Sequence, residues 1–161
     1  MRQTTPRQPQ QAQRVRNGLC GLCLLLGQLA QAEPVAIGTI KTVSGQVQVM
    51  RGAATLQPVP GFELLEADVV QTGAASAVGI VMRDQTILSA GAASVLRLDK
   101  FSFDNKTQTG AMQTTLKKGR LSAISGAIVK HSPEAVQFKT STMTLGVRGT
   151  EFIIEAEERG D

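Results

Sequence analysis

Three aspartates are the side chains best suited to catalysis in this chain of 161 residues. Asp68, Asp84 and Asp99 could supply a pair of carboxylates for glycoside hydrolysis if the fold brought two of them together. Each stands at an expected strand end or turn, where an aspartate commonly accepts hydrogen bonds from backbone N–H groups. We therefore expect structural roles for all three, and a glycan hydrolase is the weakest of the functions considered.

His131 is the only histidine in the sequence. A catalytic metal site needs several imidazole or carboxylate ligands at workable spacing, and the nearest acid, Glu134, follows a proline. A serine nucleophile needs a base, and no Gly-x-Ser-x-Gly elbow surrounds any serine. We expect His131 to be an exposed loop residue, and we expect no enzymatic activity, no metal and no cofactor.

A second candidate group lies near the C-terminus, where Gly146 and Gly149 enclose Arg148. Glycines at such positions permit a positive φ or the close approach of a neighbouring backbone. Arg148 could act with Glu151 as a fork for a carboxylate or phosphate on a ligand or partner. The alternative that we favour is structural: the glycines and Thr150 shape a bulge, and Arg148 pairs internally with Glu151.

Lys117, Lys118 and Arg120 form the only compact basic group. They could contact an anionic surface of a partner. Three charges on a strand and turn are more typical of a solvated sheet edge that discourages pairing with another strand. We expect that second role.

Charge and aromatic content argue against nucleic-acid binding. Four of the 17 basic residues lie in the first 16 positions and the first acid is Glu33, so the remaining 13 bases equal the 13 acids. Phosphate binding needs a clustered positive surplus in the folded part. Neither Trp nor Tyr is present to form stacking platforms, and the aromatic residues are five phenylalanines, which we assign to the core: Phe62, Phe101, Phe103, Phe138 and Phe152.

The first 32 residues have the three parts of a secretory signal. A polar, Arg-bearing stretch over 1–16 precedes a Leu-rich run over 19–29, and Ala30-Gln31-Ala32 supplies the small residues of a cleavage site. The apolar run is roughly half of the ~20 residues that a membrane-spanning helix needs, so no permanent anchor is expected. Cleavage after Ala32 predicts a periplasmic or secreted protein without cysteine. Lipidation at Cys20 or Cys23 stays open as an alternative, although each follows a leucine where a small residue is expected.

The remaining chain, 33–161, follows a period of two. Gln46 to Val49 alternates polar with β-branched residues, and Phe152 to Ile154 is a β-branched and aromatic run. Ser94 to Phe103 also alternates and is expected to be apolar on parts of both faces. A single helical turn is expected over 126–131, ended by Pro133.

Glycines and other turn formers separate these runs at intervals of about ten residues, as in a meander or β-roll. We predict a single all-β domain of about ten short strands, either a β-roll or solenoid-like fold or a sandwich. The expected turns are Ser44-Gly45, Arg51-Gly52, Pro60-Gly61, Thr72-Gly73, Arg83-Asp84-Gln85, Ala90-Gly91, Asp104-Asn105, Lys118-Gly119 and Ser125-Gly126.

Four segments carry a resemblance to a known family. They are the stretches Asp68-Val69-Val70-Gln71-Thr72-Gly73, Asp84-Gln85-Thr86-Ile87-Leu88, Leu116-Lys117-Lys118-Gly119-Arg120-Leu121, and Phe138-Lys139-Thr140 leading to Leu145-Gly146-Val147-Arg148-Gly149-Thr150-Glu151-Phe152. In order and spacing the chain resembles a FecR-like domain over about 69–154. The resemblance implies an all-β periplasmic module, best known as the outer half of transmembrane sigma-factor regulators that answer iron-siderophore receptors.

The chain departs from that arrangement because it shows no cytoplasmic helical domain and no membrane span. The resemblance therefore implies a freestanding exported member that senses or binds. We expect its partner to be another envelope protein, contacted through exposed strand edges or loops in envelope signalling. Relatives add another strand soon after Phe152, so we expect either an open last sheet edge or a short sequence. The alternatives are a self-associating structural protein and, less favoured, a glycan hydrolase.

Overall fold

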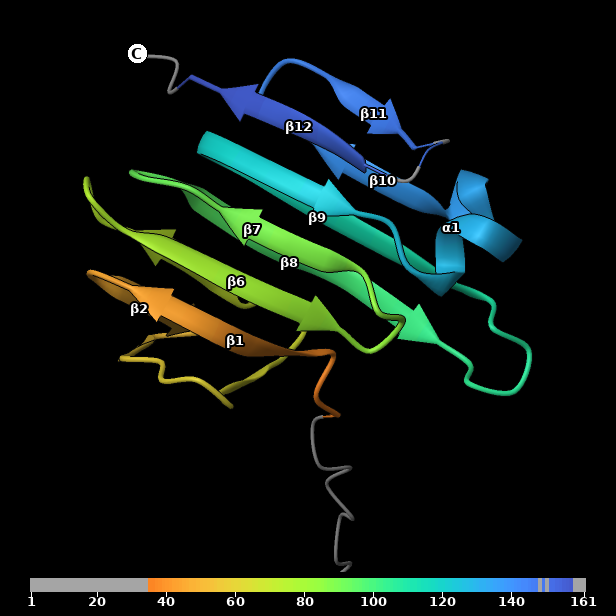
Figure 1. Ribbon diagram of the computed structural model, residues 1–161, viewed down its shortest axis with the longest axis horizontal. Coiled ribbons are helices and arrows are strands. Elements are labelled where there is room, and N and C mark those ends of the chain that lie inside the picture. Colours follow the sequence, from red (N-terminus) through yellow and green to blue (C-terminus); the bar gives the residue numbers. More distant parts are fainter. Residues whose placement is uncertain (1–34, 148, 150, 158–161) are drawn as a thin grey trace, which may run out of the picture. The chain divides into compact units, whose positions relative to one another are not determined.

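The computed structural model describes residues 35–147, 149 and 151–157. The chain divides into two compact units, Met1–Ala32 and Glu33–Asp161, and all described residues belong to the second. In that described part, twelve strands accompany one short α-helix and one 3-10 turn (Figure 1). The predicted all-β class is confirmed, with two strands more than the approximate number expected.

The strands before the long loop at 104–109 are β1 (Gly38–Ser44), β2 (Val47–Arg51), β3 (Ala54–Leu56), β4 (Glu63–Leu64), β5 (Val69–Thr72), β6 (Ala77–Met82), β7 (Ile87–Ala90) and β8 (Val95–Phe103). The elements after it are β9 (Gly110–Ile124), α1 (Ala127–His131), the 3-10 turn η1 (Pro133–Ala135), β10 (Val136–Lys139), β11 (Thr144–Gly146) and β12 (Glu151–Ala156).

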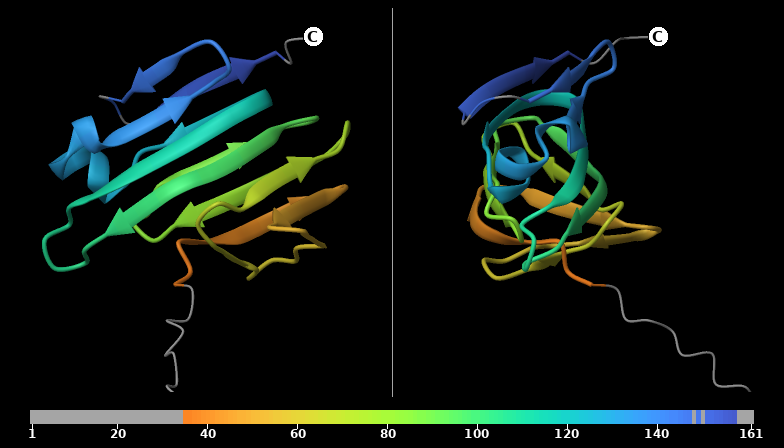
Figure 2. Two further views of the ribbon diagram at one scale, coloured as in Figure 1. Left: turned by 180° about the vertical axis from the view of Figure 1, so that it is seen from behind. Right: turned by 90° about the vertical axis from the view of Figure 1, so that its right-hand side faces the viewer.

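The strands form one curled sheet in the hydrogen-bonded order β3-β2-β5-β8-β9-β7-β6-β1-β4. All neighbours are antiparallel except β10, which runs parallel to β9. β9 is long enough to belong to both halves of the curl: its first part pairs with β8 and β10, and its last part pairs with β7 and β12. Figure 2 shows the strands wrapping around an interior, as the β-roll alternative predicted.

The change of neighbours along β9 occurs at Gly119, whose φ is +89°. A Cβ at this position would lie 2.5 Å from the Cα of Ser94. The Ser94 hydroxyl accepts the N–H of Arg120 at 3.0 Å and reaches the Arg120 carbonyl at 3.2 Å. The turn predicted at Lys118-Gly119 is therefore wrong: the glycine bends a continuous strand where another residue would clash.

The expectation that β8 is apolar on parts of both faces is also wrong. A register shift between Leu98 and Lys100 inserts an extra residue, so the alternation changes phase at Asp99. Leu96, Leu98 and Phe101 are consequently all buried on the interior side.

The other predicted strands and the short helix are present. Val47 and Val49 of β2 are both buried, and β12 contains the run from Phe152 to Ile154. α1 buries Ile128 and is followed by η1, which opens on Pro133.

The core lies inside the curl and is built from aliphatic side chains of most strands. Phe101 and Phe138 are buried in it, and the other three phenylalanines are half-buried against it, as predicted. The rings of Phe138 and Phe152 meet edge-on with centroids 4.8 Å apart, which joins β10 to β12.

Candidate functional site

Asp68 is fully buried just before β5 and is held by three donors. Arg51 donates from Nε to Oδ1 at 2.9 Å and from Nη2 to Oδ2 at 2.7 Å, and the N–H of Leu65 reaches Oδ2 at 2.8 Å. The hydrogen bond to Asp68 is the main cause that raises the pKa of Arg51 above its ordinary value, against the opposing effect of burial. This paired carboxylate supports the fold, as predicted for Asp68.

Arg51 also joins a strand near one end of the sheet order to the strand at the other end. It ends β2, and its Nη2 donates to the carbonyl of Glu63 in β4 at 2.8 Å. Its guanidinium lies 5.4 Å from the ring centroid of Phe62. Arg51 therefore closes the seam of the curled sheet between β2 and β4.

Sequence reasoning placed Arg51 only in a turn and missed this role. The signal available was an aspartate directly before a strand, which needs donors when buried. Nothing in the spacing indicated that the donor would come from 17 residues earlier in the chain.

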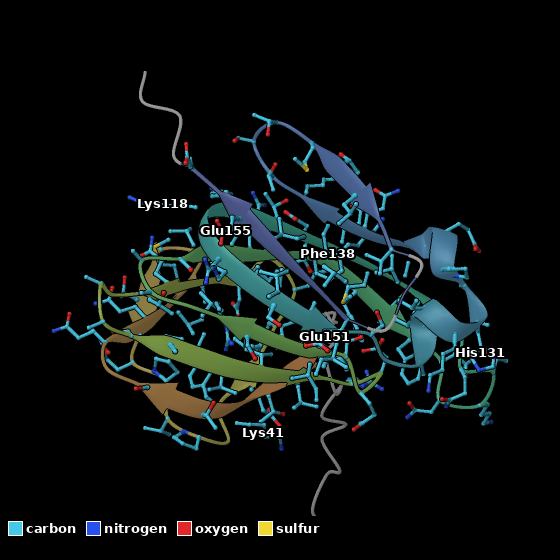
Figure 3. All side chains as sticks on the ribbon, turned by 45° about the horizontal axis from the view of Figure 1, so that its top comes forward. Lys41, Lys118, His131, Phe138, Glu151 and Glu155 are labelled. Carbon is cyan, nitrogen blue, oxygen red and sulfur yellow. The ribbon has the colours of Figure 1, made fainter. Side chains whose placement is uncertain are left out.

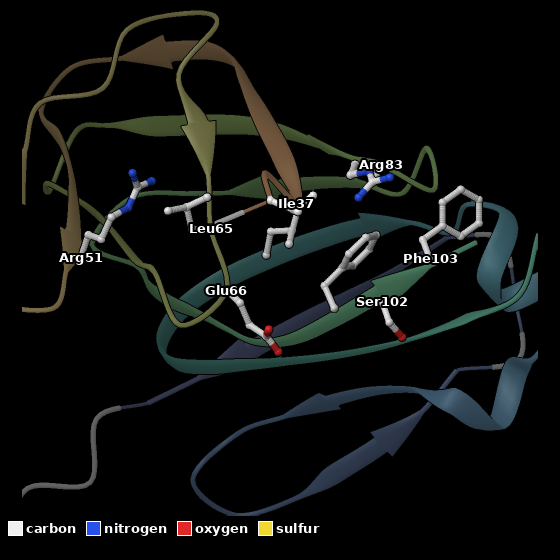
Figure 4. Close-up of a pocket in the computed structure, with 9 residues that line it drawn as sticks. Ile37, Arg51, Leu65, Glu66, Arg83, Ser102 and Phe103 are labelled. Carbon is white, nitrogen blue, oxygen red and sulfur yellow. The ribbon is translucent and has the colours of Figure 1, made fainter. Parts of the chain in front are cut away.

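A cavity of about 290 Å³ opens beside this seam (Figure 4). Its floor includes the buried side chains Ile37 and Phe101, and its rim includes the exposed charges Arg83 and Glu66. In Figure 4, Arg51 and Arg83 lie toward opposite ends, with Ile37 and Leu65 between them. The full lining is Val35, Ile37, Arg51, Leu65, Glu66, Arg83, Phe101, Ser102 and Phe103.

The cavity lies against a part of β8 that has a strand neighbour on one side only. β9 pairs with β8 along Val95–Phe103, whereas β5 pairs with it only over Val95–Arg97. Beyond the contact of Leu98 with Asp68 and Ala67, no described strand pairs with the second edge. Residues 100–103 of β8 therefore form an open strand edge, and three of them line the cavity.

The other two candidate aspartates are engaged in separate bonds. Asp84 is buried in the β6–β7 turn and accepts the N–H of Thr86 at 3.1 Å and its hydroxyl at 2.7 Å, as a turn aspartate should. Asp99 differs from the prediction because it lies at the bulge inside β8, not at a strand end. It accepts the Thr115 hydroxyl at 2.6 Å and pairs with Arg97 at 3.2 Å.

The basic group lies on β9, where Arg120 pairs with β12, whereas no described strand other than β8 pairs with residues 116–118, so an edge position for the two lysines stays a prediction. Lys118 stands opposite Val95 of β8, and Arg120 stands opposite Glu155 of β12, with which it forms an ion pair. Lys117 is exposed. Figure 3 shows Lys118 and Glu155 at the same end of the molecule. The group lies within the central strand because β9 crosses between the two halves of the curl at this point.

The C-terminal motif is described only in part. Arg148 and Thr150 lie outside the described residues, so pairing of Arg148 with Glu151 stays a prediction. Glu151 begins β12 with an exposed side chain opposite Ile124. Gly146 does not have a positive φ, and a Cβ at either glycine would meet nothing within 4 Å. The bulge that these glycines and Thr150 were expected to shape stays a prediction.

His131 is exposed, as expected, but it ends α1 instead of lying in a loop. Among the described residues, no group of three or more His, Cys, Asp and Glu could hold a metal ion. None of the helices in that part of the chain has the length and apolar character to cross a membrane.

A family model for FecR protein matches residues 68–161, which is more than half of the chain. Searches of curated proteins and of solved structures each gave no match. Members of the matched family are regulators and sensors that act in envelope signalling. The match includes the whole stretch that carried the resemblance, and the chain belongs to the FecR family.

Proposed function

We propose that this protein is an exported FecR-family module that binds another protein of the cell envelope and so takes part in sensing or signalling. The observation that carries the proposal is the presence of open strand edges in the described residues. β11 pairs only with β10, β12 pairs only with β9, and residues 100–103 of β8 pair only with β9. Such edges present backbone donors and acceptors to which a strand of a partner can add.

The exposed side chains near these edges favour contact with a protein. All three residues of β11 are exposed, including Leu145, and Ile153 of β12 is 64% exposed. The three aspartates considered for hydrolysis are each engaged in bonds that hold the fold. Binding is therefore the chemistry that these residues support best.

The location that we propose, periplasmic or secreted, rests on the leader. Its predicted cleavage site after Ala32 coincides with the boundary between the two compact units. Terminal sequencing of the protein recovered outside the cytoplasm should begin at Glu33. Recovery from the cytoplasm with all 32 residues retained would contradict this.

Self-association is the other candidate, and the charges on β12 disfavour it. Glu151 and Glu155 are both exposed on the same face of this edge strand. Figure 3 shows them toward opposite ends of it. In a twofold antiparallel pair centred on Ile153, Glu151 of one copy would stand opposite Glu155 of the other. Like charges directly opposite each other destabilise a strand pair, and the ion pair of Glu155 with Arg120 offsets only part of this repulsion. We therefore propose a partner of a different sequence.

The test is affinity capture of envelope proteins by the full chain, expressed from its complete gene so that any processing occurs. A chain with Lys130→Glu is the matched control, because Lys130 is exposed on α1 and outside the open edges. One protein should be retained by both chains over a range of salt concentrations. Retention of nothing specific at any salt concentration contradicts the proposal. Sedimentation should show no dimer; a concentration-dependent dimer would favour self-association.

A further inference from the structure

We propose that the cavity beside β8 is the receptor for one extended peptide segment of the partner. The segment adds as a strand to residues 100–103, places an aliphatic side chain in the cavity and places a carboxylate beside Arg83. This inference rests on the proposed protein-binding function and assigns its site and the chemistry of its ligand.

The backbone of β8 offers hydrogen-bonding groups on the cavity side. In an antiparallel ladder, alternate residues direct their N–H and C=O groups to the same neighbour. The N–H of Asp104 donates to Thr109 at 2.9 Å on the β9 side, so Ser102 faces β9 and the groups of Phe101 and Phe103 face the open edge. No described residue outside the β8–β9 ladder forms a backbone hydrogen bond with either phenylalanine. A peptide strand paired with this edge would form hydrogen bonds with the backbone N–H and C=O groups of both phenylalanines.

The cavity suits one apolar side chain of such a strand. Ile37 and Phe101 form a floor that is only 5% and 8% exposed, and Leu65 and Phe103 are half-buried beside them. The volume of about 290 Å³ is at the lower limit of the ~300–1,000 Å³ typical of small-molecule sites. An aliphatic side chain attached to an extended backbone is the occupant that matches this size and lining.

The charges at the rim of the cavity indicate where the bound segment carries a negative charge. Arg83 is exposed and forms no ion pair with any acid among the described residues, whereas Arg51 is already bound to Asp68. A second, more open depression shares Arg83 and is lined by one further base, Lys41, and one acid, Glu63, so Arg83 is the charge that decides the polarity at that end. Glu66 lies on the rim as well and disfavours an acid near itself. A carboxylate on the segment is therefore expected at the Arg83 end.

Selection of random heptapeptides against the full chain tests this site directly. Enriched peptides should combine an aliphatic residue with an Asp or Glu at a constant spacing. With Arg83→Glu, binding of these peptides should weaken by about tenfold, because attraction becomes repulsion. Selection against that variant should enrich Lys or Arg instead. The Lys130→Glu chain should bind as the unmodified chain does.

N-methylation of the best peptide tests strand addition. Methylation of an N–H that faces β8 should abolish binding, and methylation of the next N–H along should not, because alternate residues face opposite sides. The proposal would be overturned if methylation at both positions weakened binding equally. It would also be overturned if the selected peptides showed no enrichment of acidic and aliphatic residues, or if the Arg83→Glu chain bound the peptides as tightly as the unmodified chain.

Envelope capture with the Arg83→Glu chain separates the two proposals. Loss of the retained protein supports the cavity as its site. Retention by both the variant and the unmodified chain overturns the cavity as the site and leaves the binding function standing. If neither chain retains a protein, the binding function fails, and the peptide selection alone decides whether the cavity accepts an extended segment.

Discussion

At the scale of single residues, Asp68 shows how much of this fold depends on one buried carboxylate. Its oxygens accept three hydrogen bonds that connect the end of β2, the segment after β4 and the start of β5. A buried charge is tolerated only when it is paired and hydrogen-bonded. The Arg51 guanidinium supplies two of those bonds.

Replacement of Arg51 by Met should lower the free energy of unfolding by about 2 kcal/mol, because the Asp68 carboxylate would stay buried without its cation. Urea denaturation measures the change. The control is Arg97→Met, whose ion pair with Asp99 is more exposed and should matter by about 0.5 kcal/mol or less. Equal losses of unfolding free energy in the two variants would show that the Arg51–Asp68 pair contributes no more stability than the exposed Arg97–Asp99 pair.

Thr114 is the one described residue with a buried side-chain oxygen that lacks a hydrogen-bond partner. Replacement by Val removes this unsatisfied hydroxyl and keeps the shape, so stability should stay unchanged or rise by about 1 kcal/mol. Replacement by Ala, which also removes a methyl group, should be destabilising. If thermal unfolding showed that Thr114→Val loses as much stability as Thr114→Ala, the Thr114 hydroxyl would have to form a hydrogen bond in solution, for example to water.

Sequence reasoning predicted the structural role of Asp68 and Asp84 because an aspartate at a strand start or turn has local donors available. It missed the role of Arg51, whose partners come from other segments, and it predicted a structural role for Asp99 but placed this residue at a strand end instead of at the bulge inside β8. The open edge beside the cavity was missed for the same reason: it depends on where β5 stops pairing with β8.

At the scale of elements, the alternation of apolar residues predicted short strands well but not long ones. β2 and β12 follow a simple period of two, whereas β8 contains a bulge that shifts the phase. The predicted turn at Gly119 lies inside β9 for a related reason. A glycine in a sequence indicates a special backbone conformation, and only the neighbouring strands decide between a reversal and a bend.

Gly119→Ala should destabilise the protein by at least about 2 kcal/mol, because a positive φ and the contact with Ser94 both oppose a Cβ. Gly52→Ala is the matched control: its φ is also positive, at +58°, but a Cβ there meets nothing within 4 Å. The control should lose about 1 kcal/mol from backbone strain alone. Similar losses in chemical denaturation would refute the role of the Ser94 contact.

At the scale of the whole molecule, the described unit is a curled sheet. The Arg51 side chain bridges β2 and β4, and beside this bridge residues 100–103 of β8 have an unpaired edge. The all-β class could be predicted from turn spacing and alternation. The pairing of β1 with β6, the parallel alignment of β10 with β9 and the seam at Arg51 could not, because each joins segments whose proximity has no local signal. The site that we propose is a product of this topology: an apolar cavity, a lone exposed arginine and an unpaired strand edge at one place.

Amide hydrogen exchange of the full chain, alone and with its retained envelope protein, is the most direct test of binding at this strand edge. The account predicts fast exchange of the Phe101 and Phe103 amides in the free chain, since neither has a described partner on the open side. Binding should slow both by at least about tenfold while the amide of Ser102, which faces β9, changes little. Protection of Phe101 and Phe103 in the free chain, or unchanged exchange in the complex, would contradict the account.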